Sequence, residues 1–122
     1  MTIQLILEKA GGKLWGRVSH DENLIVDSAT TLQALEKKFR KLLKDFHQVK
    51  DIEFDYAYDL TVFFEEFNFL NQSKIAELSG INASLLRQYA SGVKNPSESQ
   101  AKKIETAVHE LAARLKNVRI YA

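Results

Sequence analysis

The chain contains no cysteine, a single proline and only five glycines in its 122 residues. Without cysteine it can form no disulfide, no thiolate nucleophile and no zinc–cysteine site. Its longest apolar runs, such as Leu5-Ile6-Leu7, are far shorter than the roughly 20 residues of a membrane-spanning helix. The amino end also lacks the basic region followed by an apolar stretch that marks a signal peptide. These absences predict a cytoplasmic protein with no membrane association.

Apolar residues make up 45% of the chain and charged residues 27%, the balance of a folded domain. The net charge of +1 is unevenly divided. Residues 1–70 carry 9 Lys/Arg and 12 Asp/Glu, whereas residues 71–122 carry 8 and 4. An excess of cations in the second part indicates a polyanionic partner and a chain in two parts, although chance unevenness would give the same count.

The first 58 residues predict a small sheet and one helix. Two β-prone runs flank Gly11-Gly12, and a polar turn at 21–23 precedes a third short strand at 24–26. Alternation over 52–58 predicts a fourth strand. A single helix covers only one face of a sheet, so we expect something else, such as a second copy, over the other. Between the strands lies an amphipathic helix whose cap is Thr30 with Gln33 and whose apolar face is Leu32, Leu35, Phe39, Leu42, Leu43 and Phe46.

After Tyr58 the pattern is helical. Apolar residues at helical spacing predict four helices over 59–117, the last of which begins with a capping box at Ser97 and Gln100. Residues 118–121 alternate and predict a short terminal strand. The predicted fold class is therefore α+β, with a βββαβ domain at 1–58 and an all-α domain at 59–122.

The stretch from Asn71 to Ser97 is the most informative. Ala76 is small enough for two short helices to cross, and Gly80 can end the first in the left-handed conformation. Asn82 is a good amino cap for the second helix, which Gly92 would end. This stretch resembles the helix-turn-helix of the lambda-repressor/Xre-type family, in the spacing of Gln72, Ala76, Gly80, Gly92, Pro96 and Ser97.

The resemblance implies sequence-specific binding to double-stranded DNA, with bases read in the major groove and phosphates held at the rim. The alternative is a helical cluster that has kept the fold and lost DNA binding. The DNA-binding residues implied are Gln72, Ser73, Ala83, Ser84, Arg87, Gln88, Lys94 and Asn95.

The first 58 residues resemble the HicB antitoxin family in the order and spacing of Glu8, Gly12, Trp15 and Thr30-Thr31-Leu32. That resemblance implies a truncated RNase H-like fold and an antitoxin-like autorepressor whose partner is a small basic toxin protein. A toxin-neutralising interaction module without DNA binding is the alternative. We also expect a homodimer, mainly through the sheet domain, with the last helix and terminal strand as other candidate contacts.

The sequence gives little support to an enzymatic function. His20, His47 and His109 are scattered, with no paired metal-binding motif, and no glycine-rich phosphate loop follows a strand. We expect no catalytic residues, no metal and no cofactor. Two further groups of residues allow both a structural and a functional interpretation. Four aromatic residues at helical spacing either belong to the core or form a groove for a partner: Phe63, Phe64, Phe67 and Phe69. The basic face of the first helix is either simply solvated or binds nucleic acid: Lys37, Lys38, Arg40, Lys41 and Lys44.

Overall fold

The computed structural model describes all 122 residues and divides them into two compact units, Met1–Phe63 and Phe64–Ala122. We call these unit 1 and unit 2. The boundary falls after Phe63, not after Tyr58 as the sequence indicated. It does so because Val62 belongs to the hydrophobic core of unit 1, and its N–H donates to Asp59 Oδ1 at 2.8 Å, which starts a helix there.

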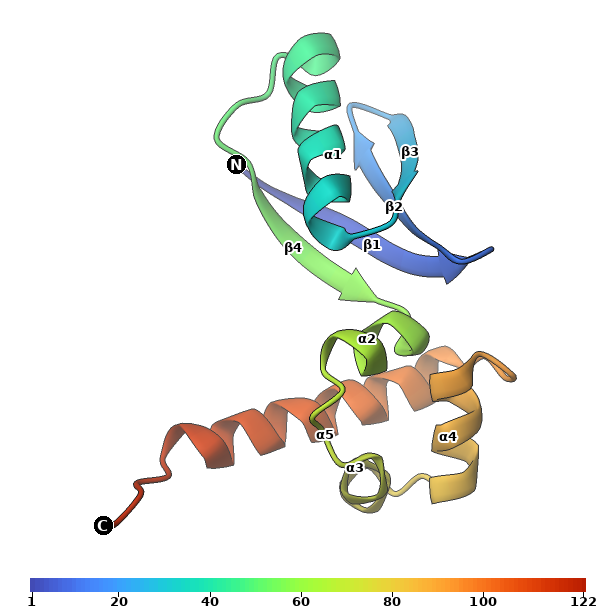
Figure 1. Ribbon diagram of the computed structural model, residues 1–122, viewed down its shortest axis with the longest axis vertical. Helices are drawn as coiled ribbons and strands as arrows, with labels where there is room; N and C mark the ends of the chain where they lie inside the picture. Colours follow the sequence, from blue (N-terminus) through green and yellow to red (C-terminus); the bar gives the residue numbers. More distant parts are fainter. The chain divides into compact units, whose positions relative to one another are not determined.

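Unit 1 has the predicted βββαβ order and builds a mixed four-stranded sheet. The strand order is β3-β2-β1-β4, with β4 parallel to β1 and the other neighbours antiparallel. Helix α1 lies across one face of this sheet (Figure 1). The elements are β1 (Thr2–Ala10), β2 (Lys13–His20), β3 (Asn23–Ala29), α1 (Leu32–His47) and β4 (Glu53–Tyr58).

Both hairpins of unit 1 use tight two-residue turns. Gly11 and Gly12 have φ of 58° and 74°, and Asp21 and Glu22 have φ of 49° and 65°. Positive φ at both central residues defines the turn type whose twist matches that of antiparallel strands. The second turn is tighter than predicted, because Asn23 already belongs to β3, where it pairs with His20.

Helix α1 packs directly on the backbone of β2. A Cβ atom added to Gly16 would lie 2.7 Å from Phe39 Cε2 and 2.9 Å from Leu35 Cδ2, closer than atoms can approach. Glycine at this position therefore lets the Phe39 ring reach the sheet. Leu5 and Leu7 of the central strand, fully buried, complete the middle of this core.

Two predicted details of α1 are wrong. The amino cap is Thr31, not Thr30: the Thr31 Oγ1 accepts from Ala34 N at 3.1 Å, and its extended backbone precedes the first helical residue. Phe46 does not join the core and is 76% exposed. The chain leaves the helix just after Phe46, and Val49 closes the core instead, with its N–H bonded to Leu43 O at 3.0 Å.

The pH dependence of unit 1 can be predicted from Tyr56. Burial, followed by its hydrogen bond to Glu36, raises the pKa of Tyr56 to about 12. The unfolded chain ionises near the ordinary tyrosine value of about 10, so unfolding is favoured as pH rises from there toward the folded value. The contribution of Tyr56 to the free energy of unfolding should be fully present below about pH 10 and should be lost as the pH rises from about 10 to about 12. Denaturant unfolding of the wild type and Tyr56→Phe at rising pH measures this; an equally steep fall in Tyr56→Phe would contradict it.

Unit 2 is a cluster of short helices followed by a long one (Figure 1). None of the chain's five helices is long and apolar enough to cross a membrane. The buried side chains of unit 2 are Phe64, Ile75, Ala76, Ile81, Leu86, Tyr89, Ile104 and Ala107. Its elements are the end of α2 (Leu60–Glu66), then α3 (Gln72–Ser79), α4 (Ala83–Ser91) and α5 (Glu98–Lys116).

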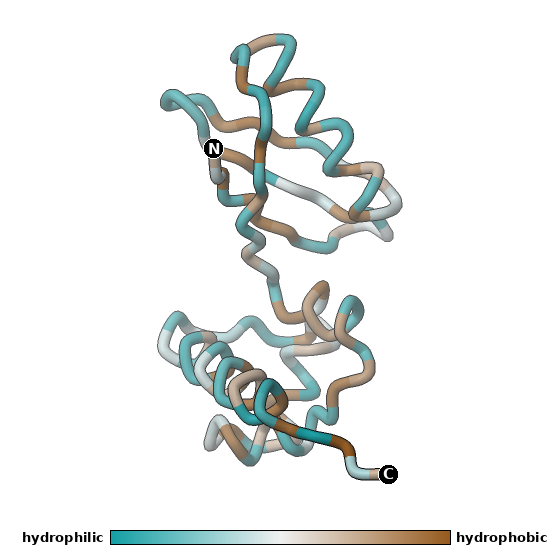
Figure 2. Tube along the Cα trace, turned by 90° about the vertical axis from the view of Figure 1, so that its left-hand side faces the viewer, coloured by the Kyte–Doolittle hydropathy of each residue, from teal (hydrophilic) through white to brown (hydrophobic).

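The predicted terminal strand is absent. Residues 118–122 follow α5 with no strand partner, and Ile120 and Tyr121 are at least 90% exposed. Figure 2 shows that hydrophobic and hydrophilic residues alternate just before the C terminus, which is the pattern that predicts a strand. Alternation gives a segment two different faces but does not supply the neighbouring strand that it needs for pairing.

The aromatic residues of the predicted stripe differ in burial. Phe64 is buried, as a core interpretation requires, whereas Phe69 is exposed.

Candidate nucleic-acid interface

The connection between α3 and α4 is built as its sequence indicates. Gly80 ends α3 with φ of 71°, and its N–H bonds to the carbonyls of Ala76 and Glu77. The next residue, Ile81, donates its N–H to Ala76 O at 3.1 Å and buries its side chain. Ala76 is itself buried, so a small residue lies where the two helices approach. This turn fixes the direction in which α4 leaves α3.

Asn82 caps α4. Its Oδ1 accepts from Ser84 N at 2.8 Å and from Leu85 N at 3.4 Å, which satisfies amides that the first turn leaves without helical partners. Only one of the two hydrogen bonds of the predicted capping box forms at the start of α5. Ser97 Oγ accepts from Gln100 N at 3.2 Å, but Gln100 Oε1 is buried without a hydrogen-bond partner.

Asn82→Ala should destabilise unit 2 by about 1 kcal/mol, since it removes these cap bonds. Asn82→Asp keeps an oxygen acceptor in place and should leave stability nearly unchanged. Its added negative charge lies at the start of α4, so it should weaken binding of any anionic ligand there. Thermal unfolding and duplex-DNA titration of both variants measure these effects. Equal stability losses in the two variants would contradict the capping role.

Four of the eight predicted site residues meet in one surface hollow of about 550 Å³. Gln72 comes from the first turn of α3, and Ser84, Arg87 and Gln88 come from α4. The rest of the lining is Ala90 and Ser91, which were not among the predicted site residues. Helical spacing could have found Ser91, because positions 84, 87, 88 and 91 follow the three- and four-residue steps of one helix face.

The other predicted residues lie around this hollow without lining it. Ser73 is exposed on α3, and Ala83 is half-buried at the start of α4. Lys94 and Asn95 are exposed in the connection between α4 and α5. That connection is held close to α4, because Gln88 O accepts from Val93 N at 3.0 Å and from Lys94 N at 3.3 Å.

Electrostatics favour an anion at this surface. Arg87 is exposed and makes no ion pair or hydrogen bond, and the Lys94 ammonium is likewise unpaired. No carboxylate occurs in the sequence between Glu77 and Glu98, and Glu77 is paired with Lys74 at 3.3 Å. Polar donors therefore line the hollow, with two free cations at or beside it.

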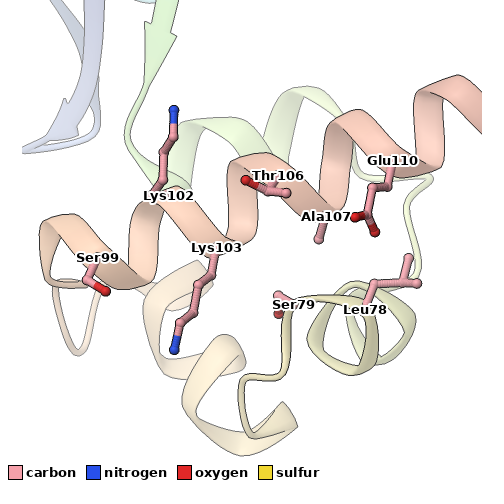
Figure 3. Close-up of a pocket in the computed structure, with 8 residues that line it drawn as sticks. All are labelled: Leu78, Ser79, Ser99, Lys102, Lys103, Thr106, Ala107 and Glu110. Carbon is pink, nitrogen blue, oxygen red and sulfur yellow. The ribbon is translucent and has the colours of Figure 1, made fainter.

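The hollow beside α5 lacks this convergence (Figure 3). It measures about 380 Å³ and lies between the end of α3 and α5. Lys102 and Lys103 extend to opposite sides of α5 (Figure 3). Lys102 Nζ is paired with Glu105 Oε1 at 3.8 Å. The Ser79 hydroxyl donates to Ala76 O at 3.0 Å. Two of its polar lining groups, the Lys102 ammonium and the Ser79 hydroxyl, therefore have local partners.

The basic face of α1 is also partly engaged within unit 1. Lys38 Nζ contacts Ser28 O at 2.6 Å and Asp27 Oδ1 at 3.7 Å. Arg40 donates to Ile52 O and lies 4.8 Å from the centre of the Phe54 ring. Lys37, Lys41 and Lys44, on the exposed side of the helix, make no ion pair or hydrogen bond through their side chains.

The histidines are less scattered than the sequence indicated. The rings of His20 and His47 meet edge to face with centroids 5.5 Å apart, because the end of β2 lies beside the end of α1. His20 Nε2 also lies 3.4 Å from Asp21 Oδ2. His109 lies on α5 in the other unit. No group of three His, Cys, Asp or Glu side chains in the structure is arranged to hold a metal ion.

Comparison of the chain with protein-family models, curated proteins and solved structures finds no match.

Proposed function

We propose that unit 2 binds double-stranded DNA in a sequence-specific manner and that the protein is a small transcriptional regulator. The observation that carries the proposal is the convergence of Gln72, Ser84, Arg87 and Gln88 on one hollow, with the Arg87 guanidinium unpaired. In this proposal α3, the Gly80 turn and α4 form a helix-turn-helix, and α4 enters the major groove.

The donors suit the two classes of contact that such binding needs. The forked guanidinium of Arg87 can bond two acceptors of guanine, and the amide of Gln88 can pair with adenine. Gln72, which lines the hollow, and Lys94 and Asn95, in the connection after α4, would contact phosphates. Because phosphate contacts fix the register while base contacts read the sequence, the two sets of variants should behave differently.

For unit 1 we propose the role implied by its resemblance to HicB antitoxins. The protein would act in the cytoplasm as the autorepressor of a toxin–antitoxin pair, with a small basic toxin as partner. The βββαβ order supports a truncated RNase H-like domain. The second candidate function is protein interaction without DNA binding. It is favoured by the exposed apolar side chains on the sheet face opposite α1, among them Trp15, Leu24 and Val26.

Selection of duplexes from a random pool by the full chain tests the DNA-binding proposal. The wild type should enrich a defined sequence motif, and Arg87→Ala should lose the preference at one or more positions of it. Arg114→Ala is the matched control, since Arg114 is an exposed arginine in the last turn of α5, outside the hollow. Failure of the wild type to enrich any motif would favour the interaction module.

A further inference from the structure

One edge of the unit 1 sheet lacks the usual protection against pairing with another strand. All seven residues of β3 pair with β2 in an unbroken register, so the edge has no bulge. It carries no lysine or proline, and its only charged residue, Asp27, is engaged by Lys38. Leu24 and Val26 are 64% and 52% exposed along it. The opposite edge, β4, carries Glu53 and Asp55, charges that discourage such pairing.

Hairpin geometry decides which backbone groups of β3 face outward. A two-residue turn makes His20 and Asn23 a hydrogen-bonded pair, so Asn23, Ile25 and Asp27 point their N–H and C=O groups toward β2. Leu24, Val26 and Ser28 then point theirs toward the free edge. The Ser28 groups are already occupied: its N–H donates to Asp27 Oδ1 at 2.7 Å, and its carbonyl accepts from Lys38 Nζ.

The free pairing groups of this edge are therefore those of Leu24 and Val26. We propose that two copies of the chain pair through β3, antiparallel and about a two-fold axis centred on Ile25. Leu24 of each copy then exchanges N–H···O bonds with the partner's Val26, which uses all the free groups of both residues. A register centred on Val26 would instead require the occupied groups of Ser28.

Side chains and charges match in the same register. On the open face, each exposed Leu24 packs against the partner's Val26, and on the helix side Ile25 meets the partner's Ile25. The two ends of β3 differ in charge: Asp21 and Glu22 precede it, whereas near its last residues Lys38 neutralises Asp27. Antiparallel pairing brings the acidic turn of each copy to the Lys38 end of the other. This complementarity identifies a second copy as the occupant of the edge.

The inference goes beyond the proposed DNA binding, because the contact lies within unit 1 and requires no nucleic acid. Sedimentation of the full-length protein at micromolar concentration tests it. The wild type should have about twice the 13.9 kDa chain mass. Leu24→Lys places a charge against a hydrophobic neighbour across the edge and should raise the dimer dissociation constant at least about tenfold.

Thr2→Lys is the matched control, with the same charge change at an exposed position of β1 on the same sheet face. It should sediment as the wild type does. Circular dichroism should show both variants folded, because Leu24 and Thr2 are exposed in the single chain. A monomeric wild type, or a Leu24→Lys variant that stays dimeric, would overturn the proposal; the latter would point to α5 instead.

Disulfide trapping tests the register, and the absence of native cysteine makes single-cysteine variants unambiguous. Ile25→Cys places two thiols opposite each other across a non-hydrogen-bonded pair, about 4.5 Å apart at Cα, and should form a covalent dimer on mild oxidation. The two Val26 Cα atoms would lie about 8–9 Å apart, beyond disulfide reach. Cross-linking by Val26→Cys instead, or by neither variant, would refute the pairing.

Discussion

Arg87→Ala should weaken binding to the selected DNA site by about 1–3 kcal/mol and relax the preference at one base pair. The guanidinium is exposed and unpaired, so its removal breaks no contact within unit 2 and should leave stability nearly unchanged. The loss should be much smaller on DNA of unrelated sequence, where no base is recognised. Equilibrium titrations of the selected and unrelated duplexes at one salt concentration measure this difference.

Lys94→Ala provides the contrast. Lys94 does not line the hollow, and in the proposal its ammonium contacts a phosphate. Its loss should weaken binding to all duplexes alike and lower the salt dependence by about one ion. If Arg87→Ala and Lys94→Ala showed equal losses on both duplexes, the assignment of base-reading and phosphate-binding roles would be wrong.

Phe39→Ala should destabilise unit 1 by about 3–5 kcal/mol. The ring is fully buried between α1 and the sheet, so truncation removes apolar burial and leaves a cavity above Gly16. The loss is large beside the total stability of about 5–15 kcal/mol that is typical of small proteins. Fluorescence of Trp15 in β2, the single tryptophan of the chain, reports the unfolding of this unit in denaturant.

Gly16→Ala should cost about 1–3 kcal/mol alone, because its methyl group collides with Phe39 and Leu35. In the Phe39→Ala background the nearest of these contacts is gone, so the same methyl group should cost less. A double-mutant cycle measures the coupling. Strict additivity would mean that the close approach of α1 to the β2 backbone does not limit packing at Gly16.

Features set by neighbouring residues could be predicted from the sequence. Gly80 and Gly92 adopt the left-handed conformation after their helices, and Asn82 caps α4, because each role depends on a few adjacent backbone groups. The four strands and five helices follow from local periodicity for the same reason. Ser84, Arg87 and Gln88 could be grouped because they follow the Asn82 cap at helical spacing, whereas Gln72 was added through the resemblance to the helix-turn-helix family.

Features that depend on residues distant in the sequence could not be predicted from it. Pattern alone does not say that β4 pairs parallel with β1, that Phe46 falls outside the core, or that the rings of His20 and His47 meet. The alternating residues 118–121 look like a strand by themselves but lack a neighbour. Gly16 gave no signal either, since its role is set by a ring more than twenty residues away in the chain.

The central claim is that the surface of α3, α4 and the connection after α4 binds duplex DNA. The most direct measurement follows the backbone amide resonances of the full-length protein by NMR as the selected duplex is added. Shifts should concentrate at residues 72–73 and 83–95 and fade as salt is raised. Shifts confined to unit 1, for example along Lys37, Lys41 and Lys44 of α1, or no shifts at all, would contradict the claim.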